Sequence, residues 1–108
     1  MQQSLDLTYL KTLMSEDENL VNRFLTIFKT QCPQQLEELR THLLNEDWAS
    51  LSTVAHSMKT QFTYLSVESL AAQAIEIETL ADEGNTDIIS DKIASFEKGC
   101  RSLLASVP

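Results

Sequence analysis

The sequence is poor in the residues that make tight turns. It contains two glycines and two prolines among 108 residues. A β-sandwich or β-barrel places turn residues roughly every ten positions, so this composition excludes those folds. Leucine, glutamate, alanine and serine are abundant, and no segment alternates apolar and polar residues as a strand does. The chain is therefore expected to be all-α.

Positive charge and long apolar runs are also scarce. Eight lysines and arginines stand against 16 acidic residues, which gives a formal net charge of −8. Nucleic acid and anionic lipid would repel such a surface, so neither is expected as a partner. No apolar run reaches the roughly 18 residues of a membrane span. Residues 1–4 lack the features of a signal peptide, so we expect a cytoplasmic location.

The motifs of common enzymes and metal sites are missing. The sequence has no P-loop, GxGxxG, HExxH or GxSxG motif. Cys32 and Cys100 are far apart and have no metal-ligand spacing, so both are expected to be small core residues. His42 and His56 have no further ligands at matching spacing, so no metal site is expected. His42 lies among leucines, and we interpret it as structural or solvated.

Apolar residues recur at steps of three and four, which predicts a series of amphipathic helices. The first is expected to end near Met14. Residues 15–18 have the pattern of a capping box, in which Ser15 would cap the second helix. The expected apolar residues of that helix are Leu20, Val21, Phe24, Ile27 and Phe28. Pro33 either begins a third helix or kinks one long helix, and the spacing leaves both possibilities open.

The next helix carries the second histidine of the chain. Asp47 is expected to cap its first turn, and its apolar pattern ends near Tyr64 or Leu65. Ser66 is expected to cap the helix that follows, whose apolar residues are Val67, Leu70, Ala74, Ile77 and Ala81.

The last helix and its neighbours complete the predicted fold. Gly84 has the position of a glycine that ends a helix, and apolar residues with heptad spacing run from Ile89 to Val107. Gly99 lies inside this last helix, which suggests close packing at that point. Short connections between long helices favour antiparallel neighbours. We expect an antiparallel up-down four-helix bundle with a short extra N-terminal helix, forming one monomeric domain over residues 1–108.

His56 lies away from the apolar face of its own helix. The residues of that face are Trp48, Leu51, Ala55, Met58, Phe62 and Leu65. At about 100° per residue, His56 is about 130° from the centre of this face and should contact water. Lys59 follows three residues later and shares its side of the helix. A neutral imidazole beside a cation suits an anionic group such as phosphoryl, although a solvated surface histidine is the simpler interpretation.

The segment from Ala55 to Lys59, followed by Leu65 and Leu70, resembles the signature of histidine-containing phosphotransfer (HPt) domains. In that family a small residue precedes the phosphorylated histidine and a lysine follows it by three positions. The similarity extends along nearly the whole chain, because Asp6–Leu10, Phe24–Phe28, Pro33, Asp47–Trp48, Ile77–Glu78 and Gly84–Asn85 follow the family layout.

The resemblance implies a role for each of three residues. His56 would be the phosphorylated nucleophile, at Nε2, and Lys59 would offset the charge of the phosphoryl group. Glu78 would hydrogen-bond the other ring nitrogen and orient the imidazole. The partners would be response-regulator receiver domains and a hybrid sensor histidine kinase. The domain would be a carrier rather than an enzyme and would need no cofactor, because the receiver brings the Mg²⁺.

The surface around His56 would then bind the receiver. We expect Met58, Thr60, Thr63 and Tyr64 to contribute to it. Thr60 stands where the family usually has a glycine directly after the lysine, so a β-branched side chain occupies the side that a partner approaches. Ser66 likewise stands near a position where the family often has glycine.

Two other classes of function compete with phosphotransfer. One is a helical adaptor that binds receiver or kinase domains and is never phosphorylated. The other, a small helical enzyme, is disfavoured because the sequence shows no convergent polar cluster. Mixing the protein with a receiver and acetyl phosphate would distinguish a phosphotransfer protein from an adaptor, since an adaptor would carry no acid-labile phosphate.

Overall fold

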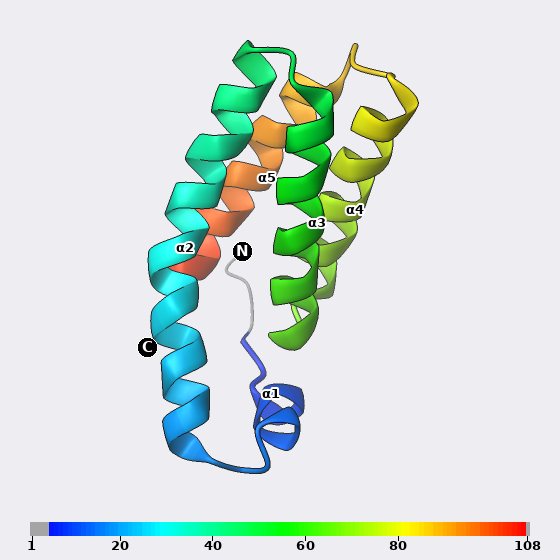
Figure 1. Cartoon of the computed structure of the whole chain (residues 1–108). Coiled ribbons are helices and arrows are strands. Elements are labelled where there is room, and N and C mark those ends of the chain that lie inside the picture. The colour runs from blue at the N-terminus through cyan, green and yellow to red at the C-terminus, as the bar shows by residue number, and fades with distance from the viewer. Residues whose placement is uncertain (1–4, 108) are drawn as a thin grey trace.

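The computed structural model describes residues 5–107, and all its regular elements are helices. They are α1 (Thr8–Leu13), α2 (Glu18–Leu44), α3 (Trp48–Tyr64), α4 (Glu68–Glu83) and α5 (Ile89–Leu104), as Figure 1 shows. Each of the helices α2 to α5 runs antiparallel to the next one in the chain, and together they form the predicted four-helix bundle, with α1 as the short extra helix. Among these described helices, none is long and apolar enough to cross a membrane.

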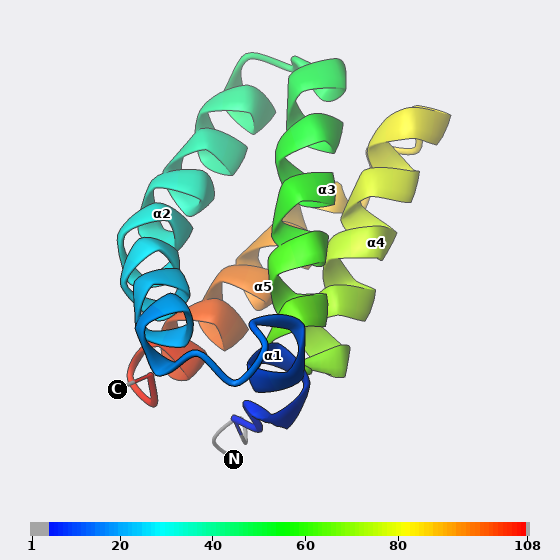
Figure 2. The same ribbon diagram turned by 60° about the horizontal axis from the view of Figure 1, so that its bottom comes forward.

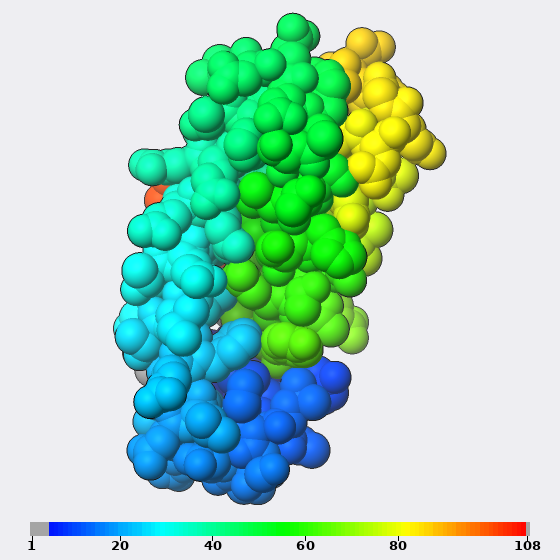
Figure 3. All heavy atoms as spheres, viewed as in Figure 1, coloured from blue at the N-terminus to red at the C-terminus, as the bar shows by residue number. Residues whose placement is uncertain are grey.

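The bundle is an elongated body of 42 × 27 × 20 Å. Helix α3 packs against α4 and α2, and α5 closes the bundle by packing against the same two helices. Helix α1 lies at one end, beside the first turns of α2 (Figures 1 and 2). In the space-filling view of Figure 3, α2 and α3 form most of the visible face and α1 closes its lower end. The outer side of α3 is therefore flanked by α2 and α4.

Three phenylalanines at the centre of the bundle join three helices. The Phe28 and Phe62 rings meet edge to face with centroids 5.8 Å apart. The Phe62 and Phe96 rings do the same at 5.7 Å. All three side chains are almost fully buried. Because Phe62 belongs to α3 and touches rings from α2 and α5, it connects the helix of His56 to the core.

The structure resolves the ambiguity about Pro33 and corrects the expected face of α2. Pro33 lies inside one continuous helix. The buried residues of α2 are Val21, Leu25, Phe28, Cys32, Leu36 and Leu39. Leu20 and Ile27 were expected in the core but are 42% and 47% exposed. Phe24 is only partly buried. The helix is rotated from its predicted phase because Leu25, rather than Phe24, continues the step of four from Val21.

Of the three predicted N-terminal helix caps, two are wrong and one is confirmed. Asp17, rather than Ser15, caps α2, and its carboxylate accepts hydrogen bonds from the N–H groups of residues 19 and 20. Ser15 has a φ of 54° and belongs to the turn after α1. Ser66 has a φ of 59°, and α4 has no side-chain cap. Asp47 caps α3 as predicted, accepting from the Ser50 N–H at 3.2 Å.

The two glycines occupy positions that a side chain would disturb. Gly84 ends α4 in the left-handed conformation, with a φ of 71°. At Gly99 an added Cβ would lie 2.8 Å from Cδ2 of Leu70 on α4. This contact confirms the packing reason expected for a glycine inside α5. Cys32 and Cys100 are free and buried, as expected.

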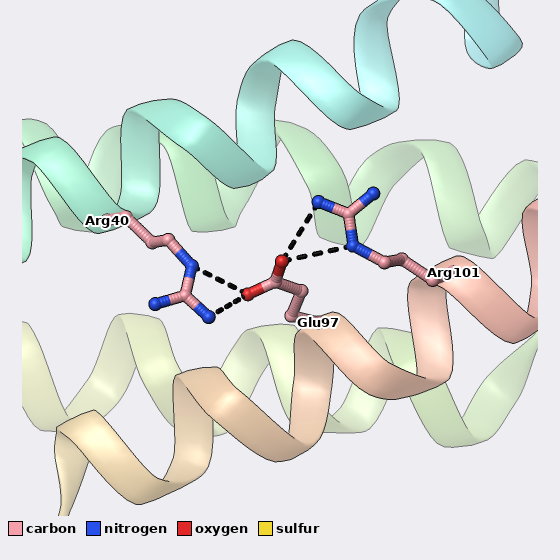
Figure 4. A network of polar contacts seen from close by, with 3 residues as sticks. All are labelled: Arg40, Glu97 and Arg101. Atoms are coloured by element: carbon pink, nitrogen blue, oxygen red, sulfur yellow. Dashed lines mark hydrogen bonds and ion pairs between the residues drawn. The ribbon is translucent and has the colours of Figure 1, made fainter.

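An ion-pair network ties α2 to α5 on the outside of the bundle (Figure 4). Glu97 of α5 accepts hydrogen bonds from Arg40 of α2 and from Arg101 one turn further along α5. The distance from Arg40 Nε to Glu97 Oε1 is 2.7 Å. Partial burial alone would raise the pKa of the Glu97 carboxyl, but the bonds from both arginines outweigh it and lower that pKa. Glu97 is therefore a shared acceptor that joins two helices.

Candidate functional site

His56 lies on the outer side of α3, opposite the residues that anchor the helix. Leu51, Ala55, Met58 and Phe62 have no exposed surface. The His56 side chain is 58% exposed. The 3.6-residue period of the helix separates His56 from these buried residues, because His56 follows Ala55 by one residue and is rotated by about 100° from it.

Glu78 reaches His56 from the neighbouring helix α4. Its Oε2 atom is 2.9 Å from Nδ1 of the imidazole, and its side chain is 24% exposed. A carboxylate accepts hydrogen bonds, so the Nδ1–H donates and a neutral ring then has its lone pair at Nε2. The contact thus favours one tautomer of the neutral ring, in which Nε2 has the free lone pair.

A second hydrogen bond joins α3 and α4 one turn away. The Ser52 hydroxyl donates to Oδ1 of Asp82 at 2.6 Å. Ser52 precedes His56 by four residues and Asp82 follows Glu78 by four, as expected for a matched pair of contacts between antiparallel helices. Sequence reasoning missed this pair, although the spacing of four on each helix could have suggested it once Glu78 was placed beside His56.

The four residues expected to bind a partner differ in their positions. Met58 has no exposed surface and cannot form part of a docking surface. That expectation was wrong because Met58 lies in the middle of the apolar face, three residues after Ala55 and four before Phe62. Thr63 and Tyr64 are exposed, and Thr60 is partly buried.

The side chains around Tyr64 connect α3 to α2. Tyr64 is 37% exposed, and its ring meets the Phe24 ring edge to face, with centroids 6.0 Å apart. The hydroxyls of Thr60 and Thr63 donate to the carbonyl oxygens of His56 and Lys59 on their own helix, at 3.3 and 2.9 Å. Both threonine hydroxyls therefore already have a hydrogen-bond acceptor within α3.

Charge is distributed unevenly around this site. Helix α3 contains no aspartate or glutamate, although the chain has 16 acidic residues. Lys59, partly buried, lies one turn from His56 on α3. An anionic group at His56 would therefore meet one cation and no carboxylate from its own helix.

Comparison with known proteins identifies the family and the fold of this chain. The model of the Hpt domain family matches residues 23–106. The crystal structure of histidine-containing phosphotransfer protein B from Pseudomonas aeruginosa PAO1 superposes with a TM-score of 0.86 at 23% sequence identity. The alignment covers 95% of this chain and 90% of that one, so the two share the fold. Among proteins with curated functions, none matches significantly. Since the family model spans most of the sequence, the chain belongs to the Hpt domain family.

Proposed function

We propose that His56 carries a phosphoryl group between receiver domains of a two-component phosphorelay. The observation that supports this most directly is the contact of Glu78 with Nδ1 of an exposed histidine, in a chain of the Hpt family. The Nε2 atom of the neutral ring attacks phosphorus in the aspartyl phosphate of a receiver. The bond from phosphorus to the aspartate oxygen breaks, and that oxygen leaves as carboxylate.

Glu78 acts on the charge that this step creates. When Nε2 bonds to phosphorus, the ring still carries its proton on Nδ1 and becomes positively charged. The carboxylate 2.9 Å away stabilises that charge. In the reverse direction, transfer to the aspartate of a second receiver restores the neutral ring with the same tautomer. Glu78 thus serves both transfers without itself exchanging a proton.

The remaining assistance comes from Lys59 and from the partner. Lys59 offsets part of the phosphoryl charge, and a pair of charges at the protein surface is worth at most about 1 kcal/mol. The receiver supplies the Mg²⁺ and its own acidic pocket, so the domain needs no cofactor and acts as a carrier rather than an enzyme. A hybrid sensor histidine kinase would provide the first receiver.

The docking surface proposed for the receiver lies on α3 and continues onto α2. On α3 it includes Thr60, Thr63 and Tyr64, and on α2 it includes Phe24, which contacts Tyr64. Ile27 of α2 is 47% exposed and lies beside Phe24 in a hollow of about 70 Å³. Of the four residues predicted for this surface, Met58 alone is left out, because it is buried. Access from one side suits a domain that binds its partners as a monomer.

The proposal is tested by incubating the protein with a panel of phosphorylated receivers from the same genome. Acid-labile, base-stable phosphate should appear on the protein and then pass to a second receiver. The alternative is an adaptor that binds a receiver and is never phosphorylated. Binding without any transfer of phosphate would favour that adaptor and contradict the proposal.

Replacing Glu78 is expected to slow transfer without preventing it. In Glu78→Ala the imidazole loses the acceptor that fixes its tautomer and stabilises its charge. Removing one preorganised group that stabilises charge in a transition state typically costs about 10²-fold or more, so the rate at saturating receiver should fall by that order. Single-turnover transfer measured against receiver concentration checks this. An unchanged rate would show that the contact with His56 has no role in the reaction.

Replacing Thr60 is expected to change which receivers react. Thr60→Gly removes a β-branched side chain near His56 and should widen the set of receivers that exchange phosphoryl, because steric exclusion is one source of specificity. It should also destabilise α3 by about 1 kcal/mol through backbone entropy. Transfer rates with cognate and non-cognate receivers measure the effect. Equal changes for every receiver would exclude a selective role.

A further inference from the structure

The Ser52–Asp82 pair lies next to the proposed phosphorylation site and has no role in the transfer as described so far. Ser52 is a buried polar residue, with 8% of its surface exposed. Its hydroxyl is 2.6 Å from Asp82 Oδ1, which is the range of a hydrogen bond to an ionised carboxylate. Such bonds are stronger than neutral ones, so the pair is a firm point of attachment between α3 and α4.

The Ser52–Asp82 hydrogen bond lies one helical turn from the contact between His56 and Glu78. Ser52 and His56 are one turn apart on α3, and Asp82 and Glu78 are one turn apart on α4. The two hydrogen bonds therefore form successive links between the same two helices, at 2.6 and 2.9 Å. The outer link, between His56 and Glu78, is the more exposed of the two, since the histidine side chain is 58% exposed. Water can compete for it more readily than for the buried hydroxyl of Ser52.

Asp82 also carries a negative charge one turn from Glu78. Residues four apart on a helix are neighbours, and like charges at that spacing repel. If Asp82 were not held by Ser52, this repulsion would displace the Glu78 carboxylate from Nδ1 of His56. The Ser52 hydroxyl holds the Asp82 carboxylate against α3 at the level of residue 52, away from the imidazole.

We infer that Ser52 and Asp82 are positioning residues for the proposed phosphotransfer, acting through the Glu78–His56 contact. Ser52 fixes where the Asp82 carboxylate lies and keeps α4 in the position that presents Glu78 to Nδ1. The expected effect on the rate of phosphotransfer rests on the proposed function. The tautomer of the His56 ring can be measured whether or not the protein transfers phosphoryl groups.

The central test compares Ser52→Ala with Thr53→Ala. Both variants lose one hydroxyl from α3, but the Thr53 hydroxyl donates to the carbonyl of residue 49 on its own helix and does not reach α4. Ser52→Ala should slow transfer at saturating receiver by about tenfold, which corresponds to ~1.4 kcal/mol, and leave the half-saturating concentration unchanged. Thr53→Ala should match the wild type. Ser52→Thr, which keeps the hydroxyl, should recover most of the rate.

The same variants are repeated in a Glu78→Ala background. If Ser52 acts through Glu78, its replacement there should cause no further loss of rate.

The tautomer of His56 is read from the ¹⁵N chemical shifts of its ring. Ser52→Ala and Asp82→Ala should each lower the fraction of rings protonated at Nδ1, whereas Thr53→Ala should not.

Two results would overturn the inference. One is an equal loss of rate from Ser52→Ala with and without Glu78, which would indicate a structural role alone. The other is an unchanged tautomer in both Ser52→Ala and Asp82→Ala. A wild-type protein that accepts no phosphoryl group would contradict the proposed function, while the ¹⁵N measurement would still decide whether the pair positions the ring.

Discussion

His56→Gln is expected to abolish phosphoryl uptake while leaving the fold intact. Glutamine has no ring nitrogen that can form a phosphoramidate, so no acid-labile phosphate should accumulate. The side chain of His56 is 58% exposed, and exposed polar substitutions usually change stability by less than about 0.5 kcal/mol. The loss of function should therefore appear in a protein with the circular dichroism spectrum and melting temperature of the wild type.

His42→Gln is the matched control for this experiment. It removes the other histidine of the chain, which lies in the last turn of α2, and should leave uptake unchanged. Labelling is measured with a radioactive phospho-receiver and checked for lability in acid. Uptake that survives in His56→Gln and disappears in His42→Gln would show that the nucleophile is assigned to the wrong residue.

Phe62→Ala is expected to be among the most destabilising single substitutions in the core. The ring is fully buried and contacts the rings of Phe28 and Phe96, so its removal leaves a cavity where three helices meet. Replacement of a buried phenylalanine by alanine typically costs about 3–5 kcal/mol. That is a large part of the roughly 5–15 kcal/mol that stabilises a small domain.

Urea denaturation of the two proteins measures this difference. Phe24→Ala is a suitable comparison, because Phe24 is only partly buried and contacts Tyr64 near the surface. Its substitution should cost clearly less than that of Phe62. A loss below about 1 kcal/mol for Phe62→Ala would be inconsistent with a core position.

The fold could be predicted from sequence wherever helix periodicity was unambiguous. The buried residues of α4 and α5 agree with the predicted pattern, including Leu70, Ala74, Ile93 and Phe96. The pattern failed in α2, where Leu20, Val21, Phe24 and Leu25 allow more than one apolar face. Only packing against the other helices selects Val21 and Leu25, and that information is not local.

The sequence could predict which residues form the site, but not how their side chains contact one another. Periodicity placed His56 on the outer side of α3, and family resemblance directed attention to Glu78. The register between α3 and α4 determines that Glu78 meets Nδ1 and that Ser52 meets Asp82. Register between two helices depends on the packing of many side chains, so a single sequence does not reveal it. Met58 was predicted to reach the docking surface, but it lies in the middle of the apolar face and is fully buried.

The position of α5 has a consequence for folding during synthesis. Phe28 and Phe62 lie on α2 and α3, yet the third ring of their group, Phe96, is on α5. The ion pair between Arg40 and Glu97 joins the same two distant parts of the chain. Helices α2 to α4 leave the ribosome before α5, so their apolar faces remain uncovered until it follows. Since exposed apolar surface favours aggregation, we expect nascent chains that stop before α5 to depend on chaperones.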